Sequence, residues 1–334
     1  MTQDIHRAFH GFVLSGPRRS LALAGPDLGD ALEGEELAWA HLPFDVDHPA
    51  PALAWMEAHV PGLDHTTRLA LTGETTRPRA LATEIGFMLI LRGVNLNAGA
   101  EPENMISCRI YLDTRRAVTL SREPLQSVGD LAEQVRAGRG PTTPGGFLHD
   151  LAEALILRIE DVLEKIEDDT DALQDKVAIP AMDSDTARAT RTEATRLRRM
   201  VLGLRRHISP QRDALAAAAS QMHDLLGKTD RRRLLEVQER HQRAVEELDT
   251  LAGRLTLVRD DIKAEQDERT NRNLYILSIM SALFLPLGFL TGLLGVNLGG
   301  IPGSSSPIGF AAFCALLAVI FGVQVMILRR LRGL

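Results

Sequence analysis

Two long stretches without a charged residue lie near the end of the 334-residue chain, at 274–296 and 308–328. A transmembrane helix needs about 20 apolar residues to cross a hydrocarbon core of about 30 Å, and both stretches reach that length. The link at 297–307 is short, neutral and rich in Gly, Ser and Pro, which favour turns. The pattern predicts a hairpin of two membrane spans. Two helices of a soluble core would normally show a polar face, and these show none.

Upstream of the hairpin, apolar residues repeat at intervals of three and four, which is typical of one face of a helix. The repeat predicts helices at 147–177, 184–206 and 212–226. Either Asp183 or Ser184 can cap the second of these helices. Pro210 lacks a backbone N–H, so we expect it to end that helix and to begin the third.

One very long helix is predicted next. From Asp230 to the first apolar stretch there is no Pro and a single Gly, and the spacing of three and four continues. We therefore expect one continuous helix from about 229 to about 294. At 1.5 Å per residue it would be about 100 Å long, and its soluble part would need partner helices.

The first 145 residues have a different pattern of short apolar runs bounded by Gly, Asn or Asp. They predict strands at 12–16, 36–44, 85–93, 105–112 and 117–120. Short helices are expected at 52–59, 64–71 and 127–137, the last of them capped by Ser127. Hairpins interspersed with helices indicate a mixed sheet packed against helices.

The chain thus divides into three predicted parts. Residues 1–145 form a cytosolic α/β domain, 146–272 a cytosolic helical stalk or funnel, and 273–334 a two-span hairpin with a basic tail. The fold class is an α+β membrane protein whose stalk continues into the first span. Arginines precede the first span and follow the second, and short Arg-rich flanks stay in the cytoplasm. Both termini are therefore expected to be cytoplasmic.

Composition and motifs exclude several classes of function. A net charge of -6 and an aromatic content of 4% argue against a nucleic-acid partner. Cys108 and Cys314 lie in separate predicted parts, so no disulfide is expected. The sequence has no Walker A loop, HExxH motif or nucleophile elbow, so we expect no enzyme activity and no bound cofactor.

Two spans per chain cannot enclose an aqueous path, so conduction would need several copies around an axis. One stripe of the long helix would line that path, because its residues recur at steps of seven, four and three. It contains Asp260, Asp267, Asn271, Leu274, Ser278, Ser281, Leu285, Gly288 and Gly292. Rings of the two aspartates would attract cations, and rings of the two leucines would form apolar constrictions. A solvated acidic face and close helix packing at the glycines are the alternative interpretations.

The first span ends in the tripeptide Gly295, Val296 and Asn297, within the segment FLPLGFLTGLLGVN at 284–297. A short loop, a second span and a basic tail follow. This arrangement resembles the CorA family of divalent metal ion transporters, which has Gly-Met-Asn at this place. Valine in the middle position resembles the ZntB zinc transporter branch. The same tripeptide recurs at 93–95 in a predicted soluble strand, so only its context is informative.

The resemblance implies a homopentamer in the bacterial inner membrane, with the first span lining a pore. It also implies that Asn297 contacts the hydrated cation at the outer mouth. A carboxamide oxygen can accept hydrogen bonds from ion-bound water without adding a charge. The expected cargo is Zn²⁺, with Mg²⁺, Co²⁺, Ni²⁺ and Cd²⁺ as related ions. The branch implies proton coupling, yet the spans contain no Asp, Glu, His, Lys or Arg that could relay protons.

Two rival functions remain open from the sequence. One is a CorA-type Mg²⁺/Co²⁺ channel gated by cytosolic Mg²⁺, although the outer loop lacks the acidic residue usual in that group. The other is a membrane-tethered scaffold or sensor that does not conduct. A further candidate is a regulatory cation site formed by His41, Asp45, Asp47 and His48 at a strand end.

Overall fold

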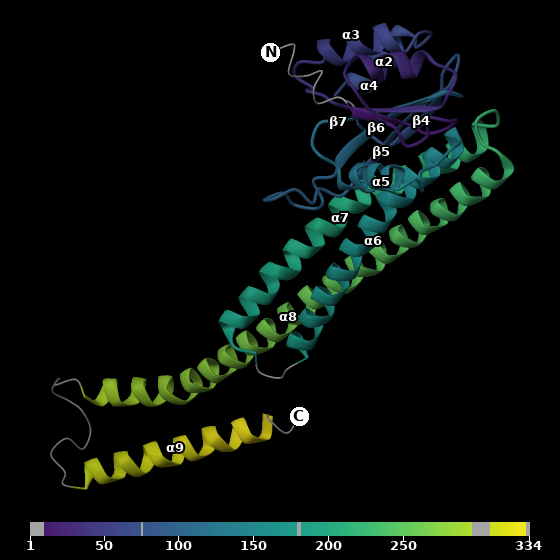
Figure 1. Ribbon diagram of the computed structural model, residues 1–334. Coiled ribbons are helices and arrows are strands. Elements are labelled where there is room, and N and C mark those ends of the chain that lie inside the picture. Colours follow the sequence, from purple (N-terminus) through teal and green to yellow (C-terminus); the bar gives the residue numbers. More distant parts are fainter. Residues whose placement is uncertain (1–9, 75, 179–181, 296–307, 332–334) are drawn as a thin grey trace. The chain divides into compact units, whose positions relative to one another are not determined.

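The computed structural model describes the whole chain except residues 1–9, 75, 179–181, 296–307 and 332–334 (Figure 1). The chain folds as two compact units, Met1–Arg259 and Asp260–Leu334. The first unit contains a β-sheet, its flanking helices and most of three long helices. The second contains the C-terminal end of the third long helix and one further helix.

The sheet of the first unit is mixed, as predicted. Its strands are β1 (His10–Val13), β2 (Ala22–Ala24), β3 (Ala38–Pro43), β4 (Arg79–Ala82), β5 (Phe87–Gly93), β6 (Ile106–Leu112) and β7 (Arg116–Ser121). The spatial order is β2-β1-β3-β7-β6-β5-β4. Only the β3–β7 pair is parallel among the described strand pairs. The central strands β3, β6 and β7 are almost fully buried, which explains why most of their residues are apolar.

Helices cover both faces of this sheet (Figure 1). On one face lie α2 (Pro26–Glu33), α3 (Ala50–His59) and α4 (His65–Thr72). Their buried side chains, including Trp55, Met56 and Leu71, form one core with Tyr111 and Leu120 of the sheet. Each such side chain contributes about 1.5–3 kcal/mol by leaving water. The opposite face packs on α6 (Pro144–Val177) and α7 (Ser184–Gln221), and α5 (Gln126–Arg136) packs against α6.

Several details of this unit differ from the sequence predictions. The first strand spans His10–Val13 instead of 12–16, and the sequence pattern did not indicate β2, β4 or α2. The serine cap predicted for α5 is wrong. That helix begins at Gln126, and the Ser127 hydroxyl donates to the Ala154 carbonyl on α6 at 3.0 Å. Tertiary contact has thus replaced the local capping bond.

Three long helices follow the sheet: α6, α7 (Ser184–Gln221) and α8 (Lys228–Leu294). The side chains of Thr143 and Asp183 cap α6 and α7 by accepting from backbone N–H groups of the first turn. The helix predicted from about 229 to about 294 is confirmed as a single element of 67 residues. The apolar residues that recur at steps of three and four are buried, as predicted: Leu234, Val237, Val245, Leu248, Leu251, Leu255, Val258 and Ile262. Leu235 and Leu257, which lie off this face, are exposed.

The predicted break at Pro210 is wrong, because α7 runs through that residue. A proline in a helix interior costs about 3 kcal/mol. Ile208 and Leu215, on either side of the proline, are fully buried, and Gln211 next to it is fully buried and hydrogen-bonded. These contacts hold both halves of the helix in line and offset the local penalty.

A buried hydrogen-bond chain joins the sheet to α7 and α8. The Arg92 backbone N–H donates to Gln211 Oε1 at 2.5 Å, and Gln211 Nε2 lies 3.0 Å from His241 Nε2. His241 Nδ1 lies 2.9 Å from the Val237 carbonyl, so it carries the hydrogen and Nε2 accepts from Gln211. Burial lowers the pKa of His241 to about 4. The ring is therefore neutral near pH 7.

Candidate functional site

The C-terminal part of α8 and the helix α9 (Gly309–Leu331) are both long and apolar enough to cross a membrane. Neither apolar segment is buried inside the protein. The predicted hairpin is thus present as two helices. Their surfaces consist largely of exposed Leu, Ile, Phe, Val and Met side chains, and hydrocarbon is the medium that suits such surfaces.

One face of each helix is turned toward the other. On α9 the partly covered residues include Phe313, Leu317, Ile320, Gln324 and Leu328, which share one helix face. On α8 the partly covered residues of the apolar segment are Ile279, Leu283, Pro286, Leu287 and Leu290. Gln324 Nε2 donates to the Ala282 carbonyl at 3.4 Å, which places the two helices side by side (Figure 1).

The stripe predicted to line a pore lies on the opposite side of α8. At about 100° per residue, Ser281, Leu285 and Gly288 lie roughly 140–200° around the helix from Leu283. The whole stripe is exposed in the single chain: Asp260, Asp267, Asn271, Leu274, Ser278, Ser281, Leu285, Gly288 and Gly292. The face is therefore free to meet other copies or water.

Of three carboxylates just before the apolar segment of α8, one forms an ion pair with a described residue and two do not. The Arg269 guanidinium lies 2.7 Å from Glu265, so that carboxylate has a partner. Asp260 and Asp267 form no ion pair within the described residues, and both are exposed. These two stripe aspartates therefore present their full charge to solvent, as cation attraction would require.

The GVN tripeptide lies at the boundary of what the structure describes. The Gly295 N–H donates to the Thr291 carbonyl at 2.9 Å, directly after the end of α8. Val296 and Asn297 lie outside the described residues. The second GVN, at 93–95, has a local role: the side chain of Asn95 donates to Glu123 at 3.1 Å. The tripeptide at 93–95 therefore has a structural role that needs no cation.

Sequence reasoning missed the pairing of Pro286 with Gln324. In a helix the N–H of residue 286 would donate to the carbonyl of residue 282, but proline has no N–H. Gln324 of α9 donates to that same Ala282 carbonyl. In hydrocarbon no water can replace the lost donor, so a side chain from the neighbouring helix fills the role. The sequence features that could have indicated this pairing are the Pro in the first span and the single Gln in the second.

This pairing gives a test of hairpin stability. We expect Gln324→Leu to lower the free energy of unfolding by about 1 kcal/mol, because it leaves the Ala282 carbonyl without a donor. In a Pro286→Ala background the backbone N–H returns, so Gln324→Leu should cost much less. Unfolding of the detergent-solubilised chain by SDS titration, analysed as a double-mutant cycle, measures the difference. Equal costs in the two backgrounds would contradict the assignment.

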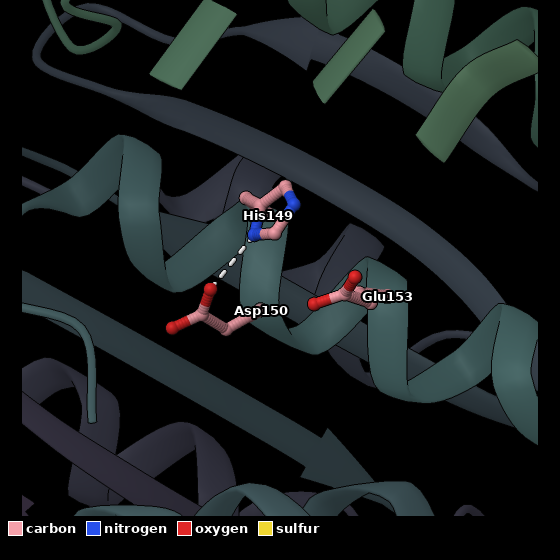
Figure 2. Close-up of side chains that lie close together, drawn as sticks. All are labelled: His149, Asp150 and Glu153. Carbon is pink, nitrogen blue, oxygen red and sulfur yellow. Dashed lines mark hydrogen bonds and ion pairs between the residues drawn. The ribbon is translucent and has the colours of Figure 1, made fainter. Parts of the chain in front are cut away.

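A group of possible metal ligands lies near the start of α6. His149, Asp150 and Glu153 have ligand atoms within 4.8 Å of one another, and His149 Nδ1 lies 2.7 Å from Asp150 (Figure 2). Both carboxylates already have partners on α8. Arg233 lies 3.2 Å from Asp150, and Arg240 lies 3.7 Å from Glu153. The group therefore functions as an ion-pair link between α6 and α8.

The cation site predicted at the end of β3 is wrong. His41 is buried, and its Nδ1 lies 2.9 Å from the Thr119 hydroxyl. His48 instead bonds the exposed Asp45 at 2.9 Å. These side chains do not converge on a common point among the described residues, because the strand turns His41 toward the α5–α6 side of the sheet.

Most of the chain matches a known protein family. The model of a family described as "CorA-like Mg²⁺ transporter protein" matches residues 34–330. The chain belongs to the CorA family. Divalent cation transport is the activity of that family, and the resemblance drawn from residues 284–297 is confirmed.

Relatives within the CorA family match almost the whole chain. The divalent cation transporter CmaX of Pseudomonas aeruginosa is 38% identical over 334 residues, covering 99% of this chain and 98% of that protein. The zinc transport protein ZntB of Yersinia enterocolitica is 36% identical over 322 residues, covering 95% and 93%. A solved structure of full-length CmaX has a TM-score of 0.80 at 36% identity and covers 98% of both chains. The predicted fold class is thereby confirmed.

Proposed function

We propose that this chain transports Zn²⁺ across the bacterial inner membrane through a central pore of a homo-oligomer. The copies, five in our proposal, would each contribute the first span to the pore, and both termini would lie in the cytoplasm. The three-part division at residues 145 and 272 belongs to the same proposal. One face of α8 would then face the axis, and α9 would face lipid.

The observation that carries this proposal is the position of the stripe. α9 packs on the side of α8 near Leu283, whereas Ser281, Leu285 and Gly288 lie on the far side. An inert anchor has no need of acidic, amide, hydroxyl and glycine positions on one continuous free face. A pore does, because acidic groups attract cations, apolar rings gate by dewetting, and polar groups contact hydrated ions.

Zinc is favoured over other divalent ions by three considerations. Several relatives at 33–36% identity are named zinc transport proteins. Val296 stands where the Mg²⁺ transporters of the family have Met. The loop at 297–307 has no acidic residue that would attract strongly hydrated Mg²⁺. The rival is a CorA-type Mg²⁺/Co²⁺ channel gated by cytosolic Mg²⁺, favoured by the description of the family model.

Flux into proteoliposomes tests the proposal. We expect Zn²⁺ uptake above that of protein-free liposomes, with related ions such as Ni²⁺, Cd²⁺ and Co²⁺ carried as well. The measurement should be made with and without an inward proton gradient. The resemblance to the zinc branch implies proton coupling, yet the spans contain no Asp, Glu, His, Lys or Arg that could relay protons, so the effect of the gradient has to be measured. Mg²⁺ uptake without gradient dependence, blocked by Mg²⁺ on the stalk side, would favour the channel. No flux of any ion would favour a scaffold.

A further inference from the structure

A polar cavity of about 360 Å³ lies in the first unit, on the side of the sheet that carries α4. Its lining includes Thr76, Arg92, Ser107 and Arg109. The volume is at the lower end of the range for small-molecule sites, roughly 300–1,000 Å³. The transport proposal uses none of these residues.

The strand register explains why these side chains meet. β5 and β6 are antiparallel, and Arg92 lies directly opposite Ser107. Side chains two residues apart point to the same face of a strand, so Arg109 shares the face of Ser107 and hence of Arg92. Two arginines and a hydroxyl are therefore placed on one face of two neighbouring strands.

Arg109 is the most unusual member of this group. Its side chain is buried, with 1% of its surface exposed, yet it forms no ion pair with any described residue. Nη1 donates to the Leu71 carbonyl at 2.8 Å, and the guanidinium carbon lies 4.4 Å from the centre of the Phe44 ring. The buried Nε has no hydrogen-bond partner. A buried charged donor without a partner is costly, so a bound water or ion is expected beside this group.

Arg92 adds a second positive charge without a counterion. Its guanidinium donates to the carbonyls of Thr76 at 3.1 Å and Met105 at 2.5 Å and to the Thr76 hydroxyl, but it pairs with no carboxylate among the described residues. Burial, together with the charges of Arg92 and Arg79, lowers the pKa of Arg109 to about 10. Both arginines line the cavity, and an anion bound between their like charges would relieve the repulsion.

The three carboxylates that line the cavity are exposed, and two of them have other contacts. Glu123 accepts from Asn95 at 3.1 Å, and Asp47 lies 4.0 Å from Arg122. Glu74 is exposed and forms no ion pair within the described residues. None of the three contacts Arg109, so the inner end of the cavity remains positive.

We propose that this cavity binds a small oxyanion, a carboxylate or a phosphate, held by the guanidinium groups of Arg109 and Arg92. Arginine suits such a ligand because its planar N–H groups match carboxylate and phosphate oxygens. The Ser107 hydroxyl would supply a further donor. The ligand would complete the hydrogen bonding of Arg109 Nε.

Titration of the full-length chain in detergent tests this proposal. Inorganic phosphate and succinate would be added separately at constant ionic strength, with binding followed by calorimetry and by the shift in unfolding temperature. We expect saturable binding and a raised unfolding temperature with at least one of them. Binding of phosphate alone or succinate alone identifies the source of the oxyanion. Absence of saturable binding with both would overturn the proposal.

Variants locate the binding. Arg109→Gln should weaken it about tenfold or more, because a charge-assisted hydrogen bond is lost. Ser107→Asp should abolish it and raise the unfolding temperature, because the new carboxylate would occupy the cavity. Arg115→Gln, at an exposed arginine in the turn before β7, is the matched control and should bind normally. If Arg109→Gln does not fold, Arg92→Gln replaces it. Equal loss in the control, or normal binding in a folded cavity variant, would contradict the proposal.

Discussion

Replacing Asn297 with alanine is expected to reduce divalent cation flux to that of protein-free liposomes while leaving the oligomer intact. The proposed pore has no charged ligand at its outer mouth, because 297–307 contains no charged residue. The carboxamide of Asn297 would then be the group that orients the hydrated ion before it enters. Alanine removes both its acceptor and its donor. Flux assays in proteoliposomes, with size-exclusion chromatography of the same samples, measure the two quantities.

The matched control is Asn273→Ala. Asn273 lies on α8, about 200° around the helix from Asn271, and therefore off the stripe. We expect its variant to conduct like the parent chain. If Asn297→Ala conducts normally as well, Asn297 has no role in permeation. If both variants lose flux, the cause would be a general effect on the helix.

Acidification is expected to destabilise the soluble unit through His241. In the folded chain its pKa is about 4, whereas an exposed histidine has a pKa near 6.5. Between these values the unfolded chain binds more protons, so stability falls as the pH is lowered. A shift of this size corresponds to about 3 kcal/mol by pH 4. Denaturant unfolding of the full-length chain in detergent, measured from pH 7 to pH 4, gives the slope.

His241→Gln should flatten this pH dependence, because glutamine can accept from Gln211 without titrating between pH 4 and 7. His207 is half-buried near Arg92 and Arg206, and its pKa is also lowered to about 4, so part of the slope remains. His48→Gln is the control. The hydrogen bond that His48 donates to Asp45 raises the pKa of His48, so loss of this histidine cannot remove an acid-induced destabilisation. An unchanged slope in His241→Gln would contradict the role of the buried ring.

The sequence was most informative where one pattern extended over many residues. The apolar runs and the uninterrupted α8 were predicted because solvent or membrane exposure imposes one pattern on whole helices. β2 and β4 have three and four residues, too few to establish a period. Pro210 was misjudged because the cost of a proline is local, whereas the contacts of Ile208 and Gln211 that offset it come from distant segments.

In the candidate site, too, the sequence predicted some features and missed others. The stripe on α8 could be derived from helix geometry alone, and its residues lie on the side of α8 away from Leu283. That they line a pore stays a prediction. The contact of Gln324 with Ala282 depends on the register between two helices, which the spacing within either helix does not define. Arg109 was missed for a similar reason. It stands in a largely apolar strand. That it has no ion-pair partner among the described residues follows only from the positions of β5 and α4 beside it.

The Pro286–Gln324 pair also bears on how the hairpin is made. During synthesis α8 leaves the ribosome before α9, and at that stage the carbonyl of Ala282 has no donor. A carbonyl without a donor is unfavourable in hydrocarbon, and the missing donor is located 42 positions later in the chain. The first helix is therefore complete, in hydrogen-bonding terms, only after the second has arrived beside it. We therefore expect the two helices to be stable in the bilayer as a pair.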